Sequence, residues 1–192
     1  MKKLLLSYVL AESTLKYPGP VNMRDIKFSY TAPGGDRKHY VSEEDVRVVL
    51  SRLPEEVYSR LRVVHFNDTG WKDRSTGHTT RRGSKEVAVF ALPPRVSLAR
   101  FLAKGQSPGT FGAKRTRQWP ELAVRRFLLY EVLLHEIGQL QIINPDSKDL
   151  RRKFAVNTKA QEFADFWRKK LWKEHFDHPD PVHNRPTPDE LT

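Results

Sequence analysis

The residues with the clearest chemical potential are His135 and Glu136, which are neighbours in the segment Leu134-His135-Glu136-Ile137-Gly138-Gln139. In the HExxH pattern, two histidines four positions apart project from one face of a helix onto a zinc ion, and the glutamate activates a metal-bound water. Here the first histidine and the glutamate are present, whereas Gln139 occupies the position of the second histidine. The segment therefore predicts a zinc site in which a neutral amide replaces one ligand.

This motif lies on one face of an expected helix. Positions at steps of four and three along residues 128–142 form a single stripe, as they do on a helix that faces a core. The stripe consists of Leu128, Val132, His135, Gln139 and Ile142. A lone histidine on such a face is more often a core residue with a satisfied hydrogen bond than a metal ligand, and this alternative stays open.

A second expected helix repeats the arrangement with two amides in the middle of its stripe. That stripe consists of Leu150, Phe154, Asn157, Gln161, Ala164 and Leu171. If the two stripes face one another, a polar cluster is buried between the helices, and its amides supply hydrogen bonds to one another. The cluster would consist of His135, Gln139, Asn157 and Gln161.

Together, the two segments resemble a known family. Residues 134–140, followed by Asn157-Thr158-Lys159-Ala160-Gln161-Glu162-Phe163-Ala164-Asp165, are similar to the pattern HEIGH and then ExxA(N/D/Q)xFA. That pattern is found in small zincin-like metallopeptidases of the ImmA/IrrE type and in related gluzincin-like proteins. The likeness includes a group of bacterial proteins that share the 167–171 stretch and the tail 177–184, and it is best over residues 119–190.

The resemblance implies a role for each of four residues. His135 matches the first zinc ligand, and Glu136 matches the general base. Gln139 matches the second ligand and Asn157 the third, which is normally a glutamate. Because the amide oxygen is a weak ligand for a borderline-soft ion, the resemblance implies a degenerate site with zinc weakly bound or absent.

Other side chains could in principle complete the metal site. Glu162 is five positions from Asn157, which turns it about 140° further round a helix, so it is a poor substitute. A histidine in a proline-rich tail can reach the site but is more often simply exposed. The remaining candidates are Asp165, His175, His178 and His183, while His65 and His78 have no spacing that commits them to a metal.

An α+β fold is expected to position these residues, with a small antiparallel sheet and short helices packed on two long helices in a minimal zincin-like domain. The expected strands are 25–30, 62–67 and 86–92, with a Gly- and Thr-containing turn region between the last two. Ser42 and Asp45 predict a capping box that begins a helix, and Pro54 opens a short one to about Leu61. The long helices are expected at 120–143 and from a Ser147 cap to about 172.

The chain is expected to form one domain over residues 1–192. The sheet and short helices occupy about 1–118, the motif helices 119–174, and a proline-rich tail 175–192. No apolar run approaches the roughly 20 residues of a membrane span, so no membrane association is expected. The absence of cysteine excludes disulfides and thiolate metal sites and fits the cytoplasm. Residues 1–11 could instead be a very short signal peptide.

A formal net charge of +11 raises the alternative of nucleic-acid binding. The basic, glycine-containing loop 104–118 supplies the candidate residues Lys114, Arg115 and Arg117. Aromatic residues are interleaved with these charges only loosely. Loops of this length are often functional, but a plain connector is an equally good interpretation.

Three functions therefore remain in view. The favoured one is a degenerate zincin-like protein that binds a peptide or protein partner through its retained cleft, with Gln161 among the binding residues. The second is an active zinc-dependent peptidase or hydrolase, with Glu136 as base and non-standard ligands beside His135. The third is a basic nucleic-acid-associated module in which the helical motif is structural only.

Overall fold

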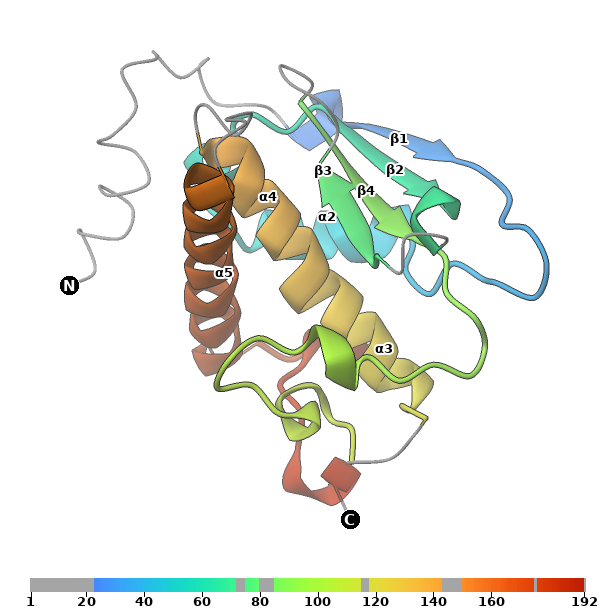
Figure 1. The fold of residues 1–192 in the computed structure, drawn as a ribbon. Helices are drawn as coiled ribbons and strands as arrows, with labels where there is room; N and C mark the ends of the chain where they lie inside the picture. Colours follow the sequence, from blue (N-terminus) through green and yellow to red (C-terminus); the bar gives the residue numbers. More distant parts are fainter. Residues whose placement is uncertain are drawn as a thin grey trace.

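The computed structural model of the chain describes residues 23–71, 75–79, 85–114, 118–142, 150–174 and 176–191. A mixed sheet lies on one side of a long helix, and a second long helix packs against the opposite side of that helix (Figure 1). The signal-like segment 1–11 lies outside the described residues. Within the described part of the chain, no helix combines the length and the apolar character needed to cross a membrane.

Four short strands form the sheet. They are β1 (Lys27–Tyr30), β2 (Val63–Asn67), β3 (Gly77–Thr79) and β4 (Glu86–Phe90). Their order is β1-β2-β4-β3, with the first three of these parallel and β3 antiparallel to β4 at one edge. Phe66 of β2 lies beside both Tyr30 of β1 and Val89 of β4.

The predicted antiparallel sheet is wrong for the three principal strands. Helix α2 (Glu43–Ser51) connects β1 to β2, and a crossover of this kind returns the chain in the same direction. Between β2 and β4 the chain forms β3, which runs back along the edge, so that β4 is again parallel to β2. The sequence predicts only a turn region at 77–79, because a three-residue strand has too little periodicity to be recognised.

The capping box predicted at the start of α2 is confirmed. The Ser42 hydroxyl accepts a hydrogen bond from the Asp45 backbone N–H at 3.2 Å, and the Asp45 carboxylate accepts one from the Ser42 N–H at 2.9 Å. A single 3₁₀ turn (Glu55–Tyr58) takes the place of the short helix predicted after Pro54.

The helix predicted at 120–143 is confirmed as one continuous helix. It consists of α3 (Glu121–Phe127), a π-helical segment (Leu128–Leu133) and α4 (Leu134–Gln141). The second long helix is α5 (Leu150–Lys173), and its predicted Ser147 cap lies outside the described residues. α2 and the continuous helix cover one face of the sheet, where Val64 and Val87 are fully buried.

The two motif helices approach one another closely at Gly138. A Cβ atom at this position would lie 2.9–3.2 Å from three atoms of the Phe163 side chain on α5. Phe163 is itself buried in the core. The glycine in the middle of α4, which costs helix propensity, is therefore required by the packing of α5.

We predict that Gly138→Ala lowers the free energy of unfolding by about 1–2 kcal/mol, because overpacking outweighs the gain in helix propensity. Urea unfolding measures this change. The double variant Gly138→Ala/Phe163→Leu should recover part of the loss, since the smaller side chain makes room for the methyl group. A stabilising effect of Gly138→Ala would show that α4 and α5 do not approach as described.

The proline-rich tail docks on the helical layer through arginines. The Arg125 guanidinium donates to Asp180 at 2.6 Å and to Asp45 at 3.0 Å. Arg126, almost fully buried, forms an ion pair with Glu190 and donates to the Pro181 carbonyl at 2.8 Å. These charge-assisted contacts fix the tail against α2 and α3.

A buried relay of side chains completes this anchoring. The Tyr130 hydroxyl lies 3.1 Å from Nδ1 of His183, and Nε2 of His183 lies 3.5 Å from the Asp45 carboxylate. Burial raises the pKa of Tyr130 to about 12. Burial also opposes ionisation of Asp45, but hydrogen bonds from His183 and Ser42 and the charge of Arg125 together lower its pKa to about 2. Asp45 is therefore ionised in the folded protein and links α2 to the tail.

We predict that Asp45→Asn lowers the free energy of unfolding by about 2 kcal/mol at pH 7. Because the pKa of Asp45 is about 2 in the folded protein and the ordinary value for an aspartate is 3.8, the unfolded chain takes up the proton first as the pH falls below 4. The stabilisation is thus present above pH 4 and is lost towards pH 2. Urea unfolding across this range should give a flatter curve for Asp45→Asn. Asp36→Asn, which changes an exposed loop carboxylate, is the control and should retain the slope of the unsubstituted protein. Equal slopes for the unsubstituted protein and both variants would show that Asp45 is not the source of this stabilisation.

Candidate functional site

A pocket of about 500 Å³ lies between the end of β3, the continuous helix and α5. Its polar lining consists of Ser75, Thr76, Glu131, His135, Glu136, Gln139, Asn157 and Gln161. The prediction that the two helical stripes face one another is confirmed, because residues from both line this one pocket. Apolar side chains of Phe101, Phe127 and Val132 complete the walls.

The closest contact between the two stripes joins His135 and Asn157. Nε2 of His135 lies 3.1 Å from the side-chain oxygen Oδ1 of Asn157. An amide oxygen can only accept a hydrogen bond, so Nε2 carries the proton and donates. While this bond is made, Nε2 has no lone pair to offer to a metal ion.

The predicted burial of this polar cluster is wrong. Asn157 is exposed, and His135, Gln139 and Gln161 are half-buried at the pocket wall. Gln161 does not pair with the other amides but donates to the Glu131 carboxylate at 2.5 Å. The cluster is therefore open to solvent and to a ligand, because the helices diverge enough to leave a pocket between them.

Glu131 is the site residue that the sequence did not reveal. It is 4% exposed, and its carboxylate forms a buried ion pair with Arg168 of α5. Gln106 of the basic loop donates to it at 2.9 Å and to Asp165 at 3.0 Å. Burial raises the pKa of Glu131, and the charge of Arg168 with the hydrogen bonds from Gln161 and Gln106 opposes this rise. The sequence did contain a signal for this residue, because Glu131 precedes His135 by four positions and interrupts an otherwise apolar run.

Glu131 and Val132, which both line the pocket, belong to the π-helical segment. In a π-helix the hydrogen bonds span five residues, so each turn holds more residues than an α-helical turn and shifts the positions that follow. Leu128 and Leu129 of this segment are fully buried, while Glu131 and Val132 line the pocket beside His135.

The edge strand β3 is in contact with the motif helix. A Cβ atom at Gly77 would clash with Val132 Cγ1 and lie 3.4 Å from Cγ of Glu136. Glycine is thus needed for β3 to approach the helix, and it forms a wall of the pocket. Glu136 itself is buried, 8% exposed.

The tail histidines are committed to other partners. His183 pairs with Tyr130 and Asp45, and Nδ1 of His178 accepts the Asp180 backbone N–H at 3.1 Å. The predicted rescue of the metal site by either is therefore not supported by their positions, and His175 lies outside the described residues. Among the residues that the structure describes, no group of three or more His, Asp and Glu side chains could hold a metal ion.

The remaining candidates that the structure describes are not among the residues that line this pocket. Glu162 is exposed, and Asp165 is held by Arg168 and Gln106. His65 lies on the sheet between Ser29 and Glu86. Lys114 is exposed, whereas Arg115 and Arg117 fall outside the described residues.

The side chains at the family's ligand positions do not fit a firmly held zinc ion. One imidazole and two neutral amides supply no negative charge, and the imidazole Nε2 is already a donor to Asn157. Comparisons of the chain with protein-family models, with curated proteins and with solved structures found no match. The residues of the pocket offer hydrogen bonds and apolar walls to a ligand.

We predict that Gln139→His and Asn157→Glu together create a zinc site with His135. All three positions already line one pocket, so only the ligand chemistry is missing. Zinc should then raise the melting temperature and bind measurably in calorimetry. Each single variant should gain less affinity for zinc than the double variant, because one amide remains among the ligands. Failure of the double variant to bind zinc better than the natural sequence would contradict this geometry.

Proposed function

We propose that this chain is a degenerate member of the zincin-like metallopeptidase class that binds an extended segment of a peptide or protein in the pocket beside α4. The observation that carries the proposal is the position of the antiparallel edge strand β3. It is in contact with the helix that bears His135 and Glu136, so that strand and helix together form the walls of one pocket.

An edge strand offers unpaired backbone groups to an added chain. The Phe90 N–H donates to the Thr76 carbonyl at 3.0 Å. Because antiparallel pairs alternate, the backbone groups of Gly77 and Thr79 point away from β4. The Ser75 hydroxyl donates to the Gly77 carbonyl at 2.7 Å, which leaves Thr79 as the better site for a new backbone bond.

The opposite wall suits a peptide backbone. The amides of Gln139 and Asn157 each combine a donor with an acceptor, as a peptide group does. Glu131 is held by the buried guanidinium of Arg168, so its charge is compensated within the protein. The neutral amides and the apolar walls then select a ligand by hydrogen bonding and shape rather than by charge.

A library of randomised decapeptides, selected on the immobilised protein, supplies the probes for a test. We predict that peptides bound in this pocket lose five- to tenfold in affinity for Thr79→Pro, because proline removes the outward N–H. Thr79→Val keeps the N–H and should retain full affinity. Isothermal titration calorimetry measures both, and chelator should leave the affinities unchanged.

Three outcomes would contradict the proposal. Selected peptides could bind both variants equally, which would place them elsewhere on the surface. Binding that chelator abolishes would assign the pocket to a metal instead. The library could also yield no binder to the natural sequence, although its edge strand is intact.

A further inference from the structure

Three polar side chains from adjacent strands are joined by hydrogen bonds across the sheet. Ser29 of β1 and His65 of β2 are register partners, and the Ser29 hydroxyl is bonded to Nδ1 of His65. Nε2 of His65 lies 3.3 Å from the carboxylate of Glu86 on β4. Serine, histidine and glutamate therefore follow one another across three parallel strands, and none of them lines the pocket beside α4.

These side chains lie on the face of the sheet opposite the core. Successive residues of a strand point to opposite faces, and the neighbours Val64 and Val87 are fully buried on the face that α2 and the continuous helix cover. Ser29 is exposed, and the side chains of His65 and Glu86 are 28% and 37% exposed. A molecule in solution can therefore reach Ser29 without any change in the core.

The Glu86 carboxylate decides which nitrogen of His65 carries the proton. An ionised carboxylate can only accept hydrogen bonds, so Nε2 donates to it. In the neutral imidazole Nδ1 is then an acceptor, and the Ser29 hydroxyl donates to it. A base within hydrogen-bond reach of a hydroxyl, itself oriented by a third group, is the arrangement that activates a serine nucleophile.

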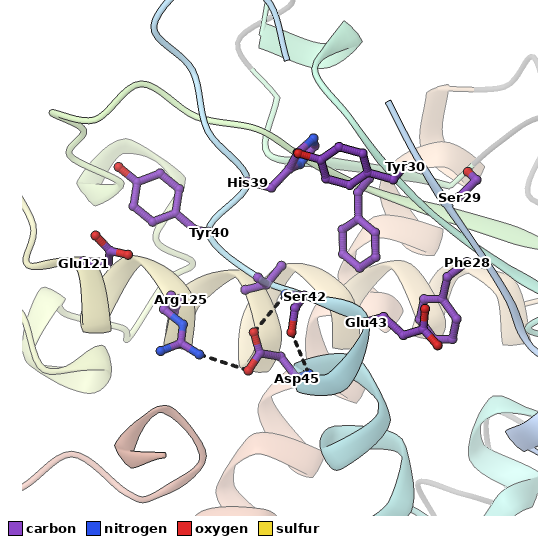
Figure 2. A pocket seen from close by; sticks show the side chains of 12 residues that line it. Phe28, Ser29, Tyr30, His39, Tyr40, Ser42, Glu43, Asp45, Glu121 and Arg125 are labelled. Atoms are coloured by element: carbon purple, nitrogen blue, oxygen red, sulfur yellow. Dashed lines mark hydrogen bonds and ion pairs between the residues drawn. The ribbon is translucent and has the colours of Figure 1, made fainter. Parts of the chain in front are cut away.

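A second pocket, of about 540 Å³, lies at the carboxyl end of β1, and Ser29 belongs to its lining. In open sheets, ligands bind at the carboxyl ends of parallel strands. Figure 2 shows Ser29 next to Tyr30 at one end of this lining, with Tyr40 and Glu121 at the other. The pocket therefore offers a substrate a place next to Ser29.

This second pocket suits a neutral group. The rings of Tyr30 and His39 lie 4.6 Å apart between centroids, and Tyr30 is 67% exposed, so that apolar surface is open to a ligand. Among the lining residues that the structure describes, each carboxylate is paired with a cation of the protein. The pairs are Glu43 with Arg47 at 2.7 Å, Glu121 with Lys38 at 2.6 Å, and Asp45 with Arg125 at 3.0 Å.

Lys27 brings a cation to the same face of the sheet as Ser29. It precedes Ser29 by two positions in β1 and is exposed. Residues two apart in a strand are separated by about 7 Å, a distance that a lysine side chain spans. Its ammonium group can therefore approach the oxygen of a carbonyl group that Ser29 attacks, where negative charge develops in the transition state.

We propose that Ser29 is a nucleophile for acyl transfer from neutral esters, with His65 as its general base and Glu86 as a positioning residue. Oγ of Ser29 attacks the carbonyl carbon of the ester while its proton passes to Nδ1 of His65. The tetrahedral adduct expels the alcohol, which takes up this proton, and an acyl-serine remains. Water then attacks the acyl group with the same help from His65, which releases the carboxylic acid and restores Ser29.

A fluorophosphonate tests the nucleophile directly. Oγ of Ser29 forms a bond to phosphorus, fluoride leaves, and the hydroxyl proton passes to His65, so that a stable phosphonate ester marks the residue. Mass spectrometry of the digested full chain should locate this ester at Ser29. Ser51, an exposed serine whose hydroxyl donates to the Val48 carbonyl at 2.8 Å, is the internal control and should remain unmodified. Equal labelling of the two serines, or labelling of neither, would overturn the proposal.

Hydrolysis of p-nitrophenyl acetate by the full chain measures the acyl transfer. Ser29→Ala should abolish the enzymatic rate, whereas Ser51→Ala should leave it unchanged. His65→Ala should lower kcat about hundredfold, and added imidazole should restore part of the loss. Glu86→Gln should lower kcat about tenfold at unchanged KM, because it acts only through His65.

Two kinetic results would contradict this assignment. Hydrolysis by Ser29→Ala at the rate of the unsubstituted protein would show that another group reacts with the ester. Failure of imidazole to restore any activity to His65→Ala would show that His65 supports the sheet and does not act as a base.

Discussion

The buried ion pair between Glu131 and Arg168 is the interaction on which the arrangement of the pocket beside α4 depends. Two charges removed from water are stable only when each is matched, so Glu131 on the π-helical segment and Arg168 on α5 must meet. Their contact joins the two long helices. Gln106 and Gln161 fill the remaining hydrogen-bonding positions of the pair, and in doing so tie the basic loop and one pocket wall to it.

This pair also joins the two helices that carry His135 and Asn157. In a metal site, the cation holds the ligand-bearing helices together. Here the Arg168 guanidinium supplies a buried positive charge between the same two helices, and Gly138 allows them to pack directly on Phe163. The amides at 139 and 157 are then free to face a ligand, since the helices do not depend on them for their positions.

The two pockets share no lining residue and use different chemistry. The pocket beside α4 offers an edge strand and neutral amides, whereas the pocket at the carboxyl end of β1 is lined by aromatic rings and by carboxylates that are paired with cations. The relay of Asp45, His183 and Tyr130 lies beside the pocket at the carboxyl end of β1 and fixes the tail. Asp45 lines this pocket and also pairs with His183 of the tail, so one residue connects the pocket wall to the tail.

The sequence alone determined the features that depend on local patterns. The periodicity of 128–142 and 150–171 predicted two facing helices, and Ser42 with Asp45 predicted the start of another. Both signals depend only on residues that are a few positions apart in the chain. The tertiary structure decided what depends on distant contacts. Strand direction followed from the crossover and from the edge position of β3, and the role of Glu131 followed from a partner 37 positions away. Tyr30 and His39 became parts of one pocket only when the loop between them folded back, a constraint that no local pattern records.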